Sequence, residues 1–183
     1  MPTNEVYIKF FAEVNQNSSN QLMNAIDQQI AQGVNKITLL ISTPGGLVFH
    51  GLSIHNYLMG LPVTVETHNF GSVDSIGVTI FSAGARRYSV PDARFLLHPI
   101  SFNVSGNFEV EKIEEFIKSL SIDRNNIAST IAKAVNIDKE EIIKKIFERT
   151  TLNPEEAKKF GLVHEIKKEL FPKGALVISI NMS

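Results

Sequence analysis

Residues 36–42 are the segment that most limits how this chain can fold. Their sequence, KITLLIS, contains a nearly unbroken run of branched apolar side chains. Such a run is typical of a strand buried on both faces, as in a parallel sheet that helices cover. Pro44, Gly45 and Gly46 follow closely and end the strand. Because parallel neighbours need crossover connections, helices are expected on either side of it.

The segments around this strand alternate between strand and helix patterns. The predicted strands are residues 5–14, 36–42, 62–67, 87–90 and 93–97, and the predicted helices are residues 19–31, 48–59 and 75–83. Ser19 is the predicted cap of the first helix, and residues 69–72 are predicted to form a turn. This alternation favours an α/β fold with a mainly parallel sheet, whose functional loops lie at the carboxyl ends of the strands.

The second half of the chain is predicted to be mostly helical. A long helix over residues 109–135 has one apolar face and a charged first part, so it should leave the sheet layer. Shorter helices at 138–149 and 153–161 and a strand at 162–166 follow, and the first residues and residues 173–183 are predicted to be loose ends. With 183 residues and no internal repeat, residues 1–183 are expected to form one domain.

Composition excludes several classes of function. Eighteen Lys and Arg residues against nineteen Asp and Glu residues give a net charge of -1. The chain therefore lacks the excess of basic residues that is typical of nucleic-acid-binding proteins. Zero cysteines exclude disulfides, thiolate metal sites and a cysteine nucleophile. No secretory signal and no apolar run long enough to cross a bilayer are found, so a cytoplasmic protein without membrane partners is expected.

Three features near predicted strand ends carry groups that are suited to catalysis. Gly45 and Gly46 can form a tight turn or bring backbone amides close to a developing oxyanion. Ser75 begins a predicted helix, where its hydroxyl either caps the helix or acts as a nucleophile. His98 closes an apolar strand, where it serves either as a structural residue or as a general base. Ser72 and Ser82 compete with Ser75 as candidate nucleophiles.

The remaining histidines do not indicate a metal centre. His50 and His55 are five residues apart, which does not place them on one helix face. His68 and His164 have no ligand partner within a recognisable motif. We therefore assign no metal and no cofactor.

Three motifs together resemble the Clp protease proteolytic subunit (ClpP) family of serine peptidases. They are ISTPGG at residues 41–46, GSVDSIGVTIFSAGARRYSVPDARFLLHP at 71–99 and NPEEAKKFGLV at 153–163. The resemblance follows the family's order over residues 6–166. It implies a crotonase-like spiral β-α-β core with a protruding helical handle at about residues 100–135, which agrees with the long helix predicted from the residues themselves.

The resemblance also implies roles for individual residues. Ser75 matches the nucleophile and His98 its general base, while Gly45, Gly46 and Ile76 match the oxyanion segments. Leu47 and Val48 either pair with an extended substrate, as the family's matching strand edge does, or belong to the core.

The third member of the catalytic triad departs from the family pattern. The family places an acidic residue eight positions before the alanine that is Ala157 here, and that position holds Arg149. A guanidinium has only donors and cannot accept the imidazole N–H bond. Glu148 or Thr150 are the candidate substitutes, while Asp74 lies too near Ser75 in sequence to replace the acid easily.

The leading hypothesis is therefore a serine endopeptidase that acts on unfolded polypeptides or peptides. One alternative is a catalytically impaired ring or scaffold subunit, which Arg149 motivates. Another is acyl-CoA chemistry on the same superfold, as in crotonases, which needs a carboxylate acid or base that no motif supplies.

The resemblance implies a ring-type homo-oligomer, with two stacked heptamers as the family's default arrangement, and an AAA+ unfoldase partner. The family's axial-pore segment before the first strand is essentially missing here, which weighs against that partner.

Overall fold

The computed structural model describes residues 4–101, 103 and 105–181 of the chain. The strands are β1 (Glu5–Phe11), β2 (Lys36–Thr43), β3 (Thr64–Asp74), β4 (Arg86–Ser89), β5 (Arg94–Leu96), β6 (Thr151–Leu152), β7 (Glu165–Ile166) and β8 (Val177–Asn181). The helices are α1 (Gln16–Ala31), α2 (Val48–Gly60), α3 (Ile76–Ser82), α4 (Val110–Val135), α5 (Lys139–Phe147) and α6 (Pro154–Lys159). The first three residues, predicted to be loose, lie outside the described residues.

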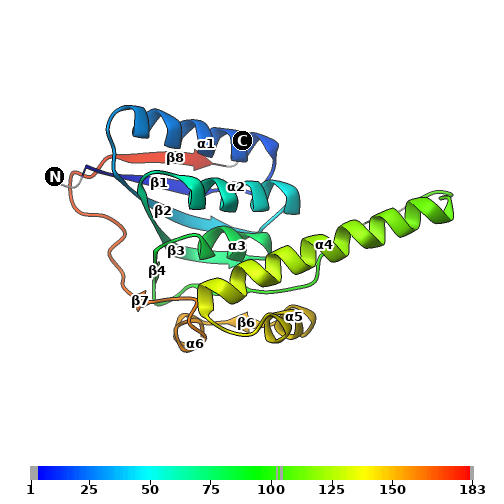
Figure 1. Ribbon diagram of the computed structural model, residues 1–183. Helices are drawn as coiled ribbons and strands as arrows, with labels where there is room; N and C mark the ends of the chain where they lie inside the picture. Colours follow the sequence, from blue (N-terminus) through cyan, green and yellow to red (C-terminus); the bar gives the residue numbers. More distant parts are fainter. Residues whose placement is uncertain (1–3, 102, 104, 182–183) are drawn as a thin grey trace.

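The strands form one sheet in the order β6-β5-β3-β2-β1-β8, and β4 pairs with β3 and β7. The described strand pairs are parallel except for β5 with β6. Helices α1, α2 and α3 lie side by side along one face of the sheet (Figure 1). The predicted α/β fold with a mainly parallel sheet is therefore confirmed. The strand that limited the fold most, β2, is buried from Ile37 to Thr43.

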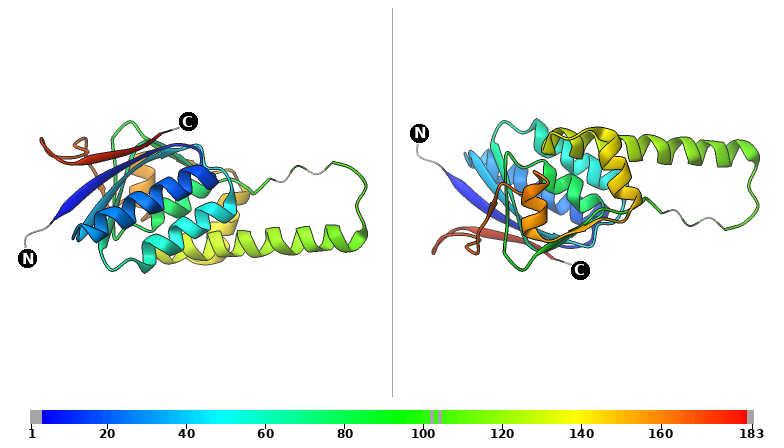
Figure 2. Two further views of the ribbon diagram at one scale, coloured as in Figure 1. Left: turned by 90° about the horizontal axis from the view of Figure 1, so that it is seen from above. Right: turned by 90° about the horizontal axis from the view of Figure 1, so that it is seen from below.

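The long predicted helix is also confirmed. Helix α4 extends well beyond the sheet, as Figures 1 and 2 show. Its C-terminal half packs against the core through Ile127, Ala128 and Ile131, whereas apolar side chains of its first half, such as Val110 and Ile117, are exposed. The helix thus has an anchored end and a free end.

Strand β3 is longer than predicted, and the predicted turn at residues 69–72 is wrong. The register between β2 and β3 shifts between Ile41 and Thr43, so the polar residues at this point form a bulge rather than a turn. The Asn69 side chain donates to the Arg94 carbonyl at 2.9 Å and accepts from the Gly71 amide at 2.9 Å, which satisfies groups that the bulge removes from the ladder. The strand therefore continues to Asp74 and pairs with β5 after the bulge.

Two predictions at the ends of elements are wrong as well. Helix α1 begins at Gln16, because Asn15 rather than Ser19 caps it by accepting a hydrogen bond from the Ser18 amide at 2.9 Å. The C-terminal segment is not all loose, since β8 pairs in parallel with β1 along the edge of the sheet.

Candidate active site

Ser75 occupies the sharp turn between β3 and α3. Its backbone lies at φ 58° and ψ -127°, a region that non-glycine residues avoid. The Ser75 amide donates to the Leu96 carbonyl at 2.8 Å, and its carbonyl accepts from the Val78 amide at 3.0 Å. The side chain makes no capping hydrogen bond to α3, so the alternative of a helix cap is wrong. Strain held in place by tertiary contacts is typical of the turn that presents a nucleophile.

Gly45 and Gly46 pass directly beside this turn. Both have positive φ values, 91° and 145°, that favour glycine. A Cβ on Gly45 would lie 2.7 Å from the Ser75 Cβ, and a Cβ on Gly46 would collide with the Val14 carbonyl oxygen. Only residues without side chains allow this approach, which explains the glycine pair better than a tight turn alone.

A bridge to Val14 fixes how the glycine segment is oriented. The Val14 amide donates to the Gly45 carbonyl at 2.7 Å, and the Leu47 amide donates to the Val14 carbonyl at 2.8 Å. In parallel pairing, the residue between two such bonds turns its own N–H and C=O to the opposite side. The Gly46 amide therefore faces away from Val14.

His98 follows β5 at the carboxyl end of the sheet. Its Nδ1 lies 2.8 Å from the Pro99 carbonyl oxygen. Because a carbonyl oxygen can only accept, Nδ1 must carry the hydrogen, which leaves Nε2 unprotonated in the neutral ring. The sequence does not reveal this main-chain partner, because every residue has a carbonyl and no side-chain pattern marks the one that accepts the hydrogen bond.

These residues line one pocket of about 230 Å³. Ser75, His98, Gly45 and Gly46 contribute to its walls. The other lining residues are Glu13, Pro44, Val48, Ile100 and Ser101. Ile76 does not line it but is the first residue of α3, where the amide has no intrahelical partner. Among the hydrogen bonds of the described residues, none joins Ser75 to His98.

The segment after α5 runs opposite His98. In the antiparallel β5–β6 pair, Phe95 faces Leu152 and Leu96 faces Thr151, and the Leu97 amide donates to the Thr150 carbonyl at 2.9 Å. His98 and Arg149 are the next residues along these two segments, but Arg149 lies in the turn that ends α5 and not in the strand pair. Arg149 itself has a positive φ of 54° at the end of α5.

The two substitute residues for the triad acid have other partners. The Thr150 hydroxyl donates to the Lys145 carbonyl at 2.9 Å, and the exposed Glu148 carboxylate lies 3.8 Å from the Lys144 amine. Neither makes a hydrogen bond to His98 among the described residues. The identity of the third member stays a prediction.

The other polar candidates near Ser75 are already engaged. The buried Asp74 carboxylate accepts from the Ser72 hydroxyl and from the Arg94 guanidinium, each at 2.7 Å. The Ser82 hydroxyl donates to the Thr79 carbonyl at 2.7 Å, within its own helix. Ser72, Ser82 and Asp74 thus make structural hydrogen bonds.

The buried histidines His55 and His68 also make structural contacts. The His55 ring lies 2.9 Å from the Thr79 carbonyl, and burial lowers its pKa. Burial, with the charge of Lys167 as a smaller cause, lowers the pKa of His68 to about 4. Within residues 4–101, 103 and 105–181, no three His, Asp or Glu side chains gather closely enough to hold a metal ion. No helix in the same ranges is both long and apolar enough to cross a membrane.

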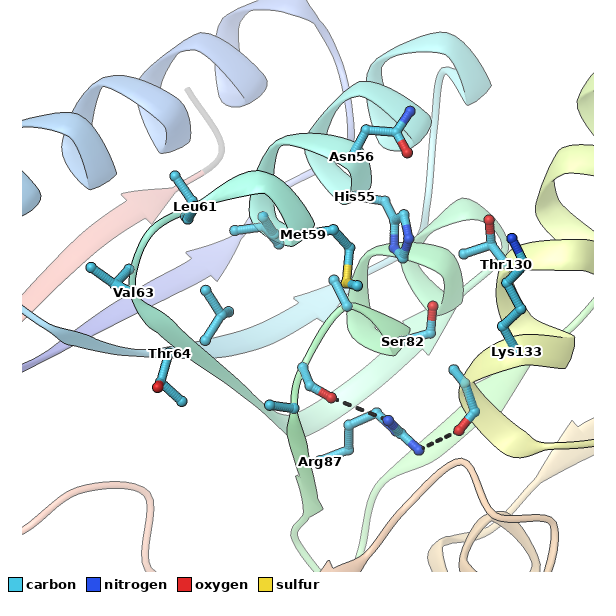
Figure 3. A pocket seen from close by; sticks show the side chains of 16 residues that line it. His55, Asn56, Met59, Leu61, Val63, Thr64, Ser82, Arg87, Thr130 and Lys133 are labelled. Carbon is cyan, nitrogen blue, oxygen red and sulfur yellow. Dashed lines mark hydrogen bonds between the residues drawn. The ribbon is translucent and has the colours of Figure 1, made fainter.

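A larger pocket lies elsewhere and is built around a buried cation. It measures about 650 Å³ and is lined by residues of α2, α3, β3 and α4, with Arg87 at its floor (Figure 3). The Arg87 guanidinium donates to the carbonyls of Gly84, Ala134, Gly161 and Leu162 at 2.8–3.1 Å. This arginine joins the ends of three helices, so its contacts are structural.

Comparison with known proteins points to one family. The family model described as Clp protease matches residues 3–169. A similar protein is ATP-dependent Clp protease proteolytic subunit 1 of Corynebacterium jeikeium, 28% identical over 71% of this chain and 69% of that protein. Another is the ATP-dependent Clp protease proteolytic subunit of Deinococcus radiodurans, 26% identical over 72% of this chain and 64% of that protein. The matched segment thus spans about two thirds of each of these relatives.

A solved structure is similar over nearly the whole chain. It is that of a ClpP1 mutant from Listeria monocytogenes, with a TM-score of 0.79 and 29% identity. The match covers 91% of this chain and 92% of that one. The predicted crotonase-like fold with a handle helix is thereby confirmed.

Proposed function

The chain belongs to the Clp protease family, and on that basis we propose that it is a serine-type endopeptidase that hydrolyses peptide bonds of unfolded proteins or peptides. The observation that carries this proposal is the single pocket lined by Ser75, His98 and the glycine pair. A nucleophile, a base and oxyanion donors are the groups that acyl transfer requires in one place.

The proposed mechanism begins with Ser75. Its Oγ attacks the carbonyl carbon of the scissile bond while Nε2 of His98 removes the hydroxyl proton. The amides of Gly46 and Ile76 stabilise the oxyanion, and the imidazolium then gives its proton to the departing amine as the C–N bond breaks. A water molecule, deprotonated by His98, hydrolyses the acyl ester and frees the serine.

The Pro99 carbonyl orients the base in this proposal. It accepts the Nδ1 hydrogen of His98 at 2.8 Å, so the ring presents Nε2 as the proton acceptor. A neutral carbonyl stabilises an imidazolium less than a carboxylate does, and loss of the triad acid costs on the order of 10⁴ in rate in the well-studied serine proteases. Slow turnover is the expected consequence of Arg149 at the family's acid position.

A homo-oligomeric ring with polypeptide substrates and a Clp ATPase partner is proposed from the family. The exposed apolar side chains on the free end of α4, including Val110, Ile113 and Ile117, support self-association. Two stacked heptamers and a cytoplasmic location stay predictions.

The second candidate is an impaired ring or scaffold subunit. Arg149 favours it, because it stands at the position where the family has its triad acid, and a guanidinium there opposes the positive charge that the imidazole gains during catalysis.

A fluorophosphonate probe tests the two candidates. We expect the probe to add one label to the wild-type protein, as measured by intact mass. Ser75→Ala and His98→Ala should both abolish this label. Ser53→Ala, which removes an exposed hydroxyl on α2, is the matched control and should leave the label in place. Absence of labelling on folded, oligomeric wild-type protein would reject the peptidase and favour the scaffold.

A further inference from the structure

A second pocket opens directly beside the candidate active site. It measures about 330 Å³ and shares four lining residues with the pocket of Ser75 and His98, namely Gly46, Val48, Ile100 and Ser101. The two pockets are therefore direct neighbours. A polypeptide whose carbonyl lies at the Ser75 hydroxyl can extend a neighbouring side chain into the second pocket.

The walls of the second pocket are largely apolar. Leu47 and Phe49, at the start of α2, are 56% and 73% exposed, so neither is a core residue. Across the pocket, α4 contributes Phe116 and Leu120, which share one face of the helix. An elongated side chain between these walls would cover apolar surface that now faces solvent.

One carboxylate interrupts this apolar lining. Asp123 stands seven positions after Phe116, on the same face of α4, and is half-buried. Its side chain makes no hydrogen bond or ion pair with the described residues. Among the described residues that line the pocket, His50 is the only other one with a titratable side chain. A partly buried carboxylate without a partner favours a ligand that brings a positive charge.

We propose that this pocket, which we call the Asp123 pocket, binds the lysine or arginine side chain of the residue whose carbonyl Ser75 attacks. Lysine and arginine combine an aliphatic stem with a cationic end, which matches apolar walls leading to a carboxylate. The exposed ring of Phe49 offers a face for the cation as well. Acidic side chains are disfavoured there by like charge. The inference rests on the proposed peptidase function and specifies its substrate class.

Binding of two peptides to the Ser75→Ala variant tests the pocket without turnover. The probes are fluorescein-labelled, alanine-rich peptides that differ only at one central residue, lysine in one and norleucine in the other. At pH 8, where an ordinary imidazole is neutral, we expect the lysine peptide to bind about tenfold or more tightly by fluorescence anisotropy. Adding Asp123→Asn should remove this preference. Adding Glu111→Gln, an equal charge change on the exposed first turn of α4, should preserve it.

The possible outcomes separate this inference from the proposed function. If the fluorophosphonate labels Ser75 but both peptides bind equally, the Asp123 pocket is rejected and the peptidase stands. If Asp123→Asn leaves a lysine preference intact, the pocket assignment is also overturned. If the preference depends on Asp123 but wild-type Ser75 stays unlabelled, the pocket is supported as a site for basic side chains and the peptidase is rejected.

Discussion

Replacing Arg87 with methionine is expected to lower the free energy of unfolding by about 3–5 kcal/mol. The guanidinium donates from Nε to the Leu162 carbonyl at 2.8 Å and from Nη1 to Gly84 at 3.1 Å. Nη2 donates to Ala134 at 2.8 Å and to Gly161 at 3.0 Å. These carbonyls lie at or just beyond the C-terminal ends of α3, α4 and α6, where the helix dipole is negative. Figure 3 shows two of the four bonds.

The magnitude follows from two opposing contributions. Each hydrogen bond from a charged donor contributes about 1.5–3 kcal/mol, so four of them contribute several kcal/mol in total. Burial of the cation offsets part of this, and the same burial lowers the pKa of Arg87. Methionine replaces the aliphatic stem but leaves four carbonyls without their donor, which is why the net loss stays at several kcal/mol.

Arg86 provides the matched control. Its side chain is 56% exposed and lies 3.8 Å from the Glu165 carboxylate, a surface pair that contributes at most about 1 kcal/mol. Urea denaturation followed by circular dichroism, at one protein concentration, should give Arg87→Met a midpoint about 2 M below that of wild type. The reasoning is refuted if Arg87→Met and Arg86→Met are destabilised equally.

Three further predictions concern pH and the active site. The pKa of His68 is about 6.5 in the unfolded chain and about 4 in the folded protein, so the unfolded chain takes up the proton first as the pH falls. The free energy of unfolding should therefore decrease by up to about 3 kcal/mol between pH 6.5 and pH 4. Urea midpoints measure this fall, and an equally steep fall in His68→Asn would contradict it. Gly46→Ala should slow fluorophosphonate labelling about 100-fold by displacing an oxyanion donor, whereas Gly60→Ala, whose Cβ meets open space, should leave the rate unchanged. Arg149→Asp places a carboxylate at the family's acid position and should raise the labelling rate at least about tenfold over Arg149→Asn. Equal rates for these two variants would count against that placement.

Much of the site's position could be predicted from the sequence, because parallel sheets gather the carboxyl ends of their strands. The loops after β2, β3 and β5 carry Gly46, Ser75 and His98, and the structure brings all three to one pocket. Their catalytic roles stay predictions. The orientation of His98 depends on a main-chain carbonyl, and the sequence does not distinguish one carbonyl from another.

The errors in the fold have physical causes of the same kind. Asn69 and Gly71 favour a turn locally, but pairing with β2 on one side and β5 on the other keeps the chain extended through a bulge. Residues 177–181 have strand character only in partnership with β1. In both segments, pairing with neighbouring strands overrides the conformation that the local sequence favours.

The pairing of β1 with β8 also bears on how the protein is made. Tyr7 pairs with Val177, so the strand that closes this edge of the sheet leaves the ribosome long after β1 has emerged. During synthesis, one edge of β1 has no partner and offers its backbone groups to other nascent chains. The early β1–β2 unit can form as soon as residue 43 emerges, but closing the edge awaits the contact between Tyr7 and Val177, and contacts between residues so far apart in sequence form slowly.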